Sequence, residues 1–196
     1  MNYHLLDLIG VFDNVVPKET CDELIKWFHD NEDRHVEGGI YGGDNLINDV
    51  DPDFKIARQI FPVPSDHVSD IITNIVFSSF NFYHDHFPAP AGHLLCAKDY
   101  SVRIYPKGVG QFKEHIDQSA GGTVTRVFAI IVYLNNVEDG GETEFPYLDM
   151  KVSPKQGRVL IFPCNYLYPH KGNMPISDDK YIITSFINFT NNVTQS

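Results

Sequence analysis

Two histidines and one aspartate form the pattern in this sequence that could do chemistry. His115-Ile-Asp117 places an imidazole and a carboxylate two residues apart, and His170 follows 55 residues after His115. On an extended strand, side chains two residues apart point to the same side, so His115 and Asp117 can present donor atoms to one ion. With a histidine from another strand they complete two imidazoles and one carboxylate, which is the ligand set of non-haem iron(II) oxygenases.

Two other histidine-containing segments compete for the metal. His35-Val36-Glu37 lies in a Gly-rich stretch without a strand pattern, and His84-Asp85-His86 stands at the expected end of a helix. A protonated imidazole suits the negative end of a helix dipole, so a capping or surface role is favoured for the second segment. With nine histidines in the chain, an HxD pair alone is a weak signal.

A lysine and a threonine strengthen the metal hypothesis. Lys180 stands ten residues after His170 at the start of a β-rich run, and Thr184 lies four residues further on the same strand face. An unpaired buried ammonium is costly, so an inward-facing lysine near a metal predicts an anionic partner such as a dicarboxylate co-substrate. The alternative is a lysine that starts the strand in solvent.

The elements that must position these residues fall into two groups. Val16-Pro17-Lys18-Glu19 opens a helix, and apolar residues recur with helical spacing for about three turns. A second helix is expected after Pro64, with Ser65 as its N-cap, ending at about Tyr83. Residues 34–53 are rich in Gly and Asp and predict a mobile loop without regular structure, whose part from Glu37 to Asp53 is a candidate lid over the substrate.

Short β-rich runs separated by turn signals follow Leu94 and indicate an antiparallel sandwich or barrel. The runs are residues 101–105, 126–134, 151–152, 158–162 and 181–189. The N-terminal stretch of residues 1–16 is expected to be an edge strand. The fold class is therefore α+β, with residues 1–196 as one domain: supporting helices and loop over about 1–93, and a β core over about 94–190.

Composition excludes several classes of protein. The 196 residues hold 26 Asp+Glu and 15 Lys+Arg, a formal charge of −11 that disfavours binding to nucleic acid and favours a neutral or basic peptide over an anionic polymer. Neither a secretory signal nor a membrane-spanning stretch is recognisable, so a cytoplasmic location without membrane partners is expected. Three cysteines without a CxxC pair indicate buried thiols. Nothing indicates an oligomeric state.

The stretch from about Tyr100 to Phe189 resembles the prolyl 4-hydroxylase family of iron(II)/2-oxoglutarate dioxygenases. The resemblance lies in several ordered motifs. These are Arg103-Ile-Tyr105-Pro-Lys-Gly108, His115-Ile-Asp117, Tyr133-Leu-Asn135, Gly140-Gly-Glu-Thr-Glu-Phe145, Pro154-Lys-Gln-Gly157 and His170 followed by Lys180. It implies a double-stranded β-helix, the jelly-roll core of cupins, buttressed by the N-terminal helices.

The resemblance also implies roles for individual residues. Fe(II) would be bound by His115, Asp117 and His170. The C5 carboxylate of 2-oxoglutarate would be held by Lys180 and Tyr133, with Thr184 beside it. Tyr105 matches a tyrosine close to the metal and co-substrate. Arg126 matches an arginine associated with substrate binding, although strand alternation puts Arg126 and Tyr133 on opposite faces unless a bulge intervenes.

The activity implied by the resemblance is hydroxylation of a peptidyl residue, foremost proline, as in procollagen-proline 4-dioxygenases. It uses Fe(II), 2-oxoglutarate and O2, with ascorbate as reductant, and gives succinate and CO2. Alternatives are the same fold acting on another side chain or a small molecule, or a cupin-like metal-binding module without turnover. A nucleic-acid repair dioxygenase is disfavoured by the acidic charge and by the missing pair of arginines after His170.

Overall fold

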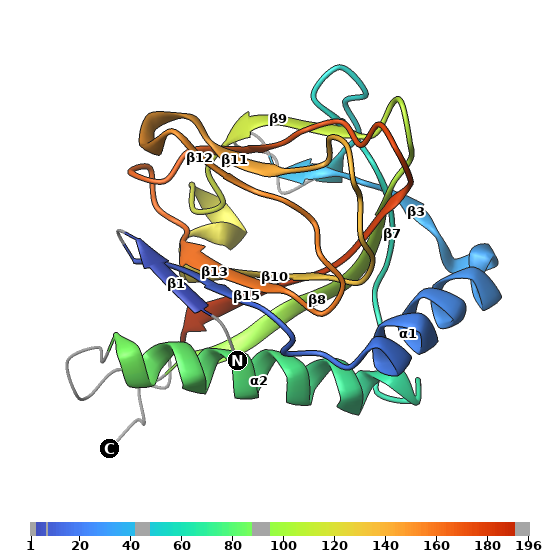
Figure 1. Cartoon of the computed structure of the whole chain (residues 1–196), viewed down its shortest axis with the longest axis horizontal. Helices are drawn as coiled ribbons and strands as arrows, with labels where there is room; N and C mark the ends of the chain where they lie inside the picture. The colour runs from blue at the N-terminus through green and yellow to red at the C-terminus, as the bar shows by residue number, and fades with distance from the viewer. Residues whose placement is uncertain (1–2, 7, 42–47, 88–94, 191–196) are drawn as a thin grey trace.

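Two antiparallel β-sheets face one another in the computed structural model, and two helices cover the outer side of the larger sheet (Figure 1). The structure describes residues 3–6, 8–41, 48–87 and 95–190. The helices are α1 (Lys18–Asp30) and α2 (Val68–His86). Three 3-10 turns are η1 (Glu32–Arg34), η2 (Gly121–Thr123) and η3 (Pro146–Leu148).

The larger sheet has the strand order β1-β2-β13-β10-β15-β8-β7-β3. Its strands are β1 (Tyr3–Leu6), β2 (Ile9–Phe12), β3 (Val36–Glu37), β7 (Arg58–Ile60), β8 (Leu95–Tyr105), β10 (Arg126–Tyr133), β13 (Val159–Pro163) and β15 (Lys180–Phe189). The long strand β15 lies between β10 and β8, so both of its edges are hydrogen-bonded over most of its length.

The smaller sheet has the order β12-β11-β14-β9-β6. Its strands are β6 (Lys55–Ile56), β9 (Gln111–His115), β11 (Thr143–Phe145), β12 (Met150–Val152) and β14 (His170–Gly172). The strands β4 (Ile40–Tyr41) and β5 (Asn48–Asp49) pair with each other in a separate two-stranded sheet. Every strand pairing among the described residues is antiparallel, and two facing antiparallel sheets of this kind form the double-stranded β-helix predicted from the sequence.

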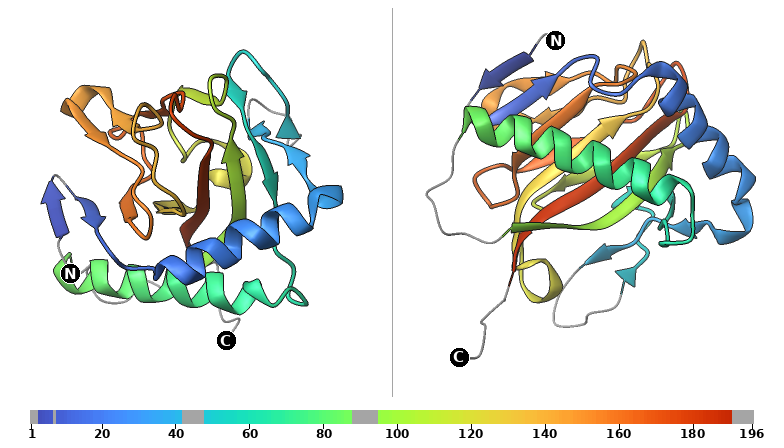
Figure 2. Two further views of the ribbon diagram at one scale, coloured as in Figure 1. Left: turned by 45° about the vertical axis from the view of Figure 1, so that its right-hand side comes forward. Right: turned by 90° about the horizontal axis from the view of Figure 1, so that it is seen from below.

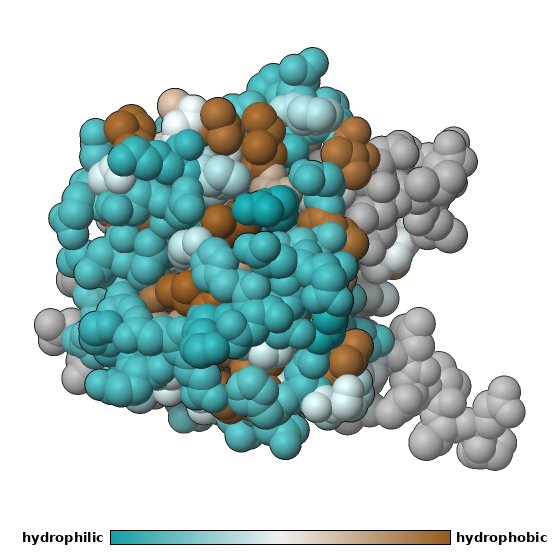
Figure 3. Space-filling view, turned by 90° about the vertical axis from the view of Figure 1, so that its right-hand side faces the viewer, coloured by the Kyte–Doolittle hydropathy of each residue, from teal (hydrophilic) through white to brown (hydrophobic). Residues whose placement is uncertain are grey.

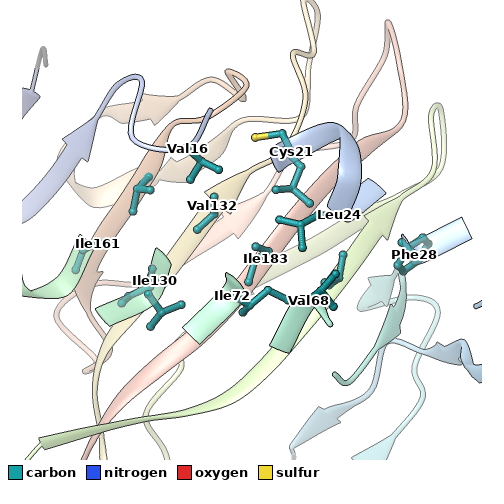
Figure 4. Close-up of a cluster of buried hydrophobic side chains, with 14 of the residues drawn as sticks. Val16, Cys21, Leu24, Phe28, Val68, Ile72, Ile130, Val132, Ile161 and Ile183 are labelled. Carbon is teal, nitrogen blue, oxygen red and sulfur yellow. The ribbon is translucent and has the colours of Figure 1, made fainter. Parts of the chain in front are cut away.

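Strand alternation divides the apolar residues into two cores. In β15, Ile183 and Ile187 point to the helices, whereas Ile182 and Phe186 point between the sheets. The outer core joins the larger sheet to α1 and α2 (Figure 4). Viewed from below, α2 runs along the outer face of this sheet (Figure 2). The inner core lines the space between the sheets, which is where polar side chains are also buried.

The predicted helices are present with one correction. Cys21, Leu24 and Phe28 are buried on one side of α1, as their spacing predicted. The second helix begins at Val68 rather than directly after Pro64, and His67 occupies the N-cap position, so Ser65 as N-cap was wrong. Asp66 explains the delay, because its carboxylate accepts the Val63 N–H at 2.8 Å and stabilises a turn before the helix.

The expected structureless loop at residues 34–53 was wrong in part. Val36 and Glu37 form β3, which extends the larger sheet by pairing with β7, and β4 pairs with β5. Two-residue strands are too short to show a periodic hydrophobic pattern, so they could not be predicted from the sequence. Residues 42–47 of the candidate lid lie outside the described residues.

The predicted strands agree with the structure to within about two residues, except that β8 begins at Leu95 rather than Ser101. The N-terminal stretch forms two strands, and β1 is the outermost strand of its sheet. Among the described residues, no helix has the length and apolar character needed to cross a membrane. The side of the molecule drawn in Figure 3 is mainly hydrophilic, with scattered hydrophobic side chains.

Candidate metal and co-substrate site

The smaller sheet brings the three predicted metal ligands together. His115 ends β9 and His170 begins β14, and these two residues are direct partners across the strand pair. Asp117 lies two residues beyond the end of β9, in a bend rather than on the strand as expected. Its carboxylate nevertheless approaches both imidazoles, with Oδ1 3.7 Å from His115 Nε2 and Oδ2 3.4 Å from His170 Nε2.

Backbone carbonyls orient the two imidazoles. His115 Nδ1 donates its N–H to the carbonyl oxygen of Lys113 at 2.7 Å, and His170 Nδ1 donates to that of Tyr168 at 3.2 Å. A carbonyl only accepts, so both rings carry a proton on Nδ1, and Nε2 is the nitrogen that faces the Asp117 carboxylate. The sequence could not name these partners, because each is the backbone of a residue two positions earlier.

The charge states of His115 and Asp117 favour the binding of a cation. Burial, reinforced by His170, lowers the pKa of His115 to about 3, so this imidazole is neutral near pH 7. Burial raises the pKa of Asp117, but the adjacent His170 and His115 outweigh it and leave that pKa below its usual value. Two imidazoles, of which His115 is neutral, and an ionised carboxylate have ligand atoms within 4.8 Å of one another and fit the donor set of a non-haem iron(II) site.

A narrow cavity of about 40 Å³ adjoins the three ligand candidates. Its other lining residues include Tyr105, Thr143, Lys180 and Thr184. Tyr105, Lys180 and Thr184 were predicted from the sequence to bind a co-substrate. They share the inner face because β15 pairs with β8 in a register that sets Lys180 opposite Tyr105.

Lys180 is a buried ammonium inside this narrow cavity. Its side chain is 2 % exposed, its Nζ donates to the carbonyl oxygen of Gly141 at 2.9 Å, and it lies 4.5 Å from the centre of the Tyr105 ring. Burial lowers the pKa of Lys180 to about 8, with Glu142 acting weakly in the opposite direction. Among the described residues no carboxylate forms an ion pair with it, so a bound anion would complete its contacts.

Tyr133 takes a different position from the other predicted co-substrate residues. It is fully buried and its hydroxyl donates to Thr143 Oγ1 at 2.7 Å, while Thr143, rather than Tyr133, lines the narrow cavity. Thr143 was missed as a site residue, although it stands within the Gly140–Phe145 motif. Thr184 Oγ1 lies 2.8 Å from Ser101 Oγ, which fixes its hydroxyl at the cavity wall.

A wide cavity of about 580 Å³ adjoins the narrow one, and His115, Asp117 and Arg103 line both spaces. Its charged lining residues are Lys55, Asp99, Arg103, Glu114, Asp117 and Arg126. Phe54, Phe61, Phe112 and Phe186 supply aromatic surface. The wide cavity therefore combines apolar walls with fixed charges beside the candidate metal ligands, as substrate sites commonly do.

Two β-bulges bring Arg126 and Asp99 together at the wide cavity. On β10, Arg126 pairs with Asn188 and Phe128 with Ile187, so one extra residue reverses the alternation and turns Arg126 inward. On β8 the register against β15 also shifts, at Asp99, whose φ is +59°. The Arg126 guanidinium then lies 3.1 Å from the Asp99 carboxylate and 3.6 Å from the centre of the Phe186 ring.

Sequence reasoning missed Lys55, Asp99 and Arg103 at this site. Arg103 had a usable signal, because it lies two residues before Tyr105 and must share its strand face. Lys55 had none, since it stands in a two-residue strand beside the segment that was expected to be a loop.

Comparison with known proteins agrees with this geometry. Residues 100–188 match the model of the 2OG-Fe(II) oxygenase superfamily. The curated protein named "Putative prolyl 4-hydroxylase" from Acanthamoeba polyphaga mimivirus is 28 % identical over 141 residues, which cover 68 % of this chain and 50 % of that protein. The chain thus spans about half the length of the curated relative it matches.

Solved structures of prolyl hydroxylases share the fold. The viral collagen prolyl hydroxylase of Paramecium Bursaria Chlorella virus-1, solved with 2OG, superposes with a TM-score of 0.70 at 22 % identity, covering 94 % of this chain and 97 % of that chain. A Trichoplax adhaerens prolyl hydroxylase, solved with a hypoxia inducible factor peptide fragment, gives a TM-score of 0.70 at 16 % identity, over 92 % and 83 % of the two chains. Residues 100–188 therefore resemble a 2OG-Fe(II) oxygenase domain, and the chain as a whole is similar to prolyl 4-hydroxylases in sequence and fold.

Proposed function

We propose that this chain is an Fe(II)- and 2-oxoglutarate-dependent dioxygenase that hydroxylates a prolyl residue in a peptide or protein. One observation carries the proposal: His115, Asp117 and His170 converge beside a narrow cavity whose only buried ammonium, among the described residues that line it, is Lys180. A metal-binding triad and a buried cation in one cavity are what a chelating dicarboxylate requires.

The proposed roles follow from these positions. The two Nε2 atoms and the Asp117 carboxylate would hold Fe(II), and Lys180 would bind the distal carboxylate of 2-oxoglutarate. With Fe(II) bound, the co-substrate and O2 supply the oxidising power that places one oxygen atom on a C–H bond, while 2-oxoglutarate becomes succinate and CO2. The protein itself orients ligands and excludes water, because Tyr105 and Lys180 are almost completely buried.

The wide cavity is the proposed substrate site. Arg126 would contact the peptide, and its guanidinium is held in place by Asp99 and by the ring of Phe186. The proline assignment rests on the resemblance to prolyl hydroxylases, since a phenylalanine-lined cavity accepts a pyrrolidine ring but does not single it out. Ascorbate is proposed as the reductant that keeps the iron in the Fe(II) state.

The test is a turnover assay with Fe(II), 2-oxoglutarate, ascorbate and proline-containing peptides. We expect succinate in amounts equal to peptide that has gained one oxygen atom, measured by mass spectrometry. Peptides with alanine in place of proline, and the His170→Ala variant, serve as controls. Oxygen gained on another residue would correct the substrate, and metal binding without succinate from any peptide would favour a binding module without turnover.

A further inference from the structure

A second buried lysine lies in the wide cavity. Lys55, in the short strand β6, is 4 % exposed. Its Nζ donates to the carbonyl oxygen of Gly39 at 3.0 Å and lies 4.6 Å from the centre of the Phe112 ring. An ammonium has three N–H donors, and the described contacts use one of them on a neutral acceptor. Lys55 is therefore placed at the cavity wall with donor capacity to spare.

The acids that line the wide cavity form no ion pair with Lys55. In the parts of the chain that the structure describes, no carboxylate forms an ion pair with Lys55 or with Arg103. Asp99 is paired with Arg126, Asp117 faces the two imidazoles, and Glu114 accepts a hydrogen bond from Tyr147. Lys55 and Arg103 thus have no carboxylate paired with them in a largely buried space, although the whole chain carries a formal charge of −11.

Charge in a buried space is costly unless it is compensated. Burial, with Arg103 as a positive charge nearby and Asp117 acting in the opposite direction, lowers the pKa of Lys55 to about 6, so without a bound anion the neutral amine is favoured near pH 7. A negatively charged ligand would offset both effects, because it would supply the missing partner to Lys55 and reduce the repulsion between the two cations. The cavity is open and large enough for such a group to enter with the peptide.

We propose that Lys55 and Arg103 form a binding site for a carboxylate group of the substrate within the wide cavity. The inference rests on the proposed function, since it takes the wide cavity to be the place where the peptide binds. The carboxylate comes either from an Asp or Glu side chain close to the target residue or from the C-terminus of the peptide. This site would therefore favour peptides that carry a carboxylate, whereas the acidic exterior by itself favours neutral or basic peptides.

A purely structural role for Lys55 predicts something else. A lysine that only ties Gly39 to the smaller sheet would change stability when replaced, but it would not distinguish a carboxylate from an amide on the peptide. Preference between matched charged and neutral peptides is therefore the readout that separates the two roles.

The experiment measures peptide binding without turnover. The full chain is loaded with Mn(II) and 2-oxoglutarate under anaerobic conditions, and fluorescence anisotropy follows labelled peptides around one proline. Each peptide pair differs by Glu against Gln at one position within two residues of the proline, with both ends blocked. A further pair differs only by a free C-terminal carboxylate against an amide, which distinguishes the two sources of the group.

We expect one charged peptide to bind about tenfold more tightly than its neutral partner, because charge-assisted hydrogen bonds to a buried cation are strong. Lys55→Met should abolish this preference and Lys55→Arg should keep it. Lys98→Met, which removes an exposed lysine of β8, should leave it unchanged.

Several outcomes would overturn the inference. Equal affinities within every peptide pair for the wild-type protein exclude a carboxylate site, and this result does not depend on whether Lys55→Met folds. A preference that survives both Lys55→Met and Lys55→Gln excludes Lys55. Proline hydroxylation without any carboxylate preference would refute only this inference. A carboxylate preference without hydroxylation in aerobic Fe(II) assays would refute only the proposed function.

Discussion

Lys180 in the narrow cavity and Lys55 in the wide cavity are built in the same way. Each lysine Nζ donates to a glycine carbonyl, at 2.9 Å for Gly141 and 3.0 Å for Gly39. Each also lies over an aromatic ring, 4.5 Å from the centre of Tyr105 and 4.6 Å from that of Phe112. Burial lowers both pKa values, to about 8 for Lys180 and about 6 for Lys55.

The two lysines differ in the strands that carry them. Lys180 belongs to a ten-residue strand with hydrogen-bonded neighbours on both sides, and its cavity measures about 40 Å³. Lys55 belongs to a two-residue strand at the edge of the smaller sheet, and its cavity measures about 580 Å³. A cation on an interior strand suits one small ligand of fixed shape, whereas one on an edge strand can adapt to a larger and more variable ligand.

The largest expected effect comes from a residue shared by both cavities. Asp117→Ala should lower Mn(II) or Fe(II) affinity by at least about a hundredfold and remove succinate formation, because it deletes the only carboxylate of the ligand set. Metal titration and a succinate assay measure both effects. Glu138→Gln, which removes an exposed acid, should change neither. Near-normal activity of Asp117→Ala would refute the metal assignment.

A crossed pair of variants should separate the two lysines. Lys180→Ala should raise the KM for 2-oxoglutarate by roughly 10- to 100-fold, because it removes a charged hydrogen bond to the distal carboxylate. The KM for a preferred carboxylate-bearing peptide should change little. Lys55→Met should raise the KM for that peptide and leave the KM for 2-oxoglutarate nearly unchanged. If either variant raised both constants equally, the two cavities would not be independent sites.

The pH dependence of co-substrate binding should follow Lys180. Burial lowers its pKa to about 8, so the protonated form that binds an anion predominates below this pH and is lost above it. Affinity for 2-oxoglutarate should therefore fall above about pH 8, by about tenfold for each further pH unit. Isothermal titration with Mn(II)-loaded protein measures this. Lys180→Arg should flatten the profile, and an unchanged profile would contradict the assignment.

The smallest effect is expected at Tyr133. Its hydroxyl reaches Thr143 rather than the cavity, so Tyr133→Phe should raise the KM for 2-oxoglutarate by less than about tenfold. Thr143→Val, which changes the cavity wall itself, should have the larger effect. Steady-state kinetics at varied 2-oxoglutarate compares the two variants. A larger loss for Tyr133→Phe would show that Tyr133 contacts the co-substrate directly.

The sequence predicted the parts of the site that lie on regular strands. His115, Lys180 and Thr184 could be assigned because motif order and a period of two place them on inward faces. Arg126 could be assigned only with a bulge, and the register shift between Arg126 and Phe128 confirms that one is present. Double-stranded β-helix topology followed from the family resemblance rather than from any residue pattern.

The remaining features depend on contacts that a sequence pattern does not carry. Ser65 matched the usual N-cap residue type, but the carboxylate of Asp66 stabilised a turn there instead. Lys55 faces the wide cavity because backbone pairing with Phe112 fixes β6 beside β9. Such short strands form because an adjacent strand pairs with them, and two residues are too few to show periodicity in the sequence.

The two bulges near Asp99 and Arg126 show that the register of the strands shapes the wide cavity. Each leaves a single extra residue without a partner in a strand that flanks β15, and uninterrupted pairing of the same strands would reverse the faces of the side chains beyond it. If β10 instead paired with β15 without this register shift, Arg126 would point toward α2 and Asp99 would lose its partner, although no side chain had been changed. At this end of the sheet, the register between strands therefore decides which side chains enter the wide cavity.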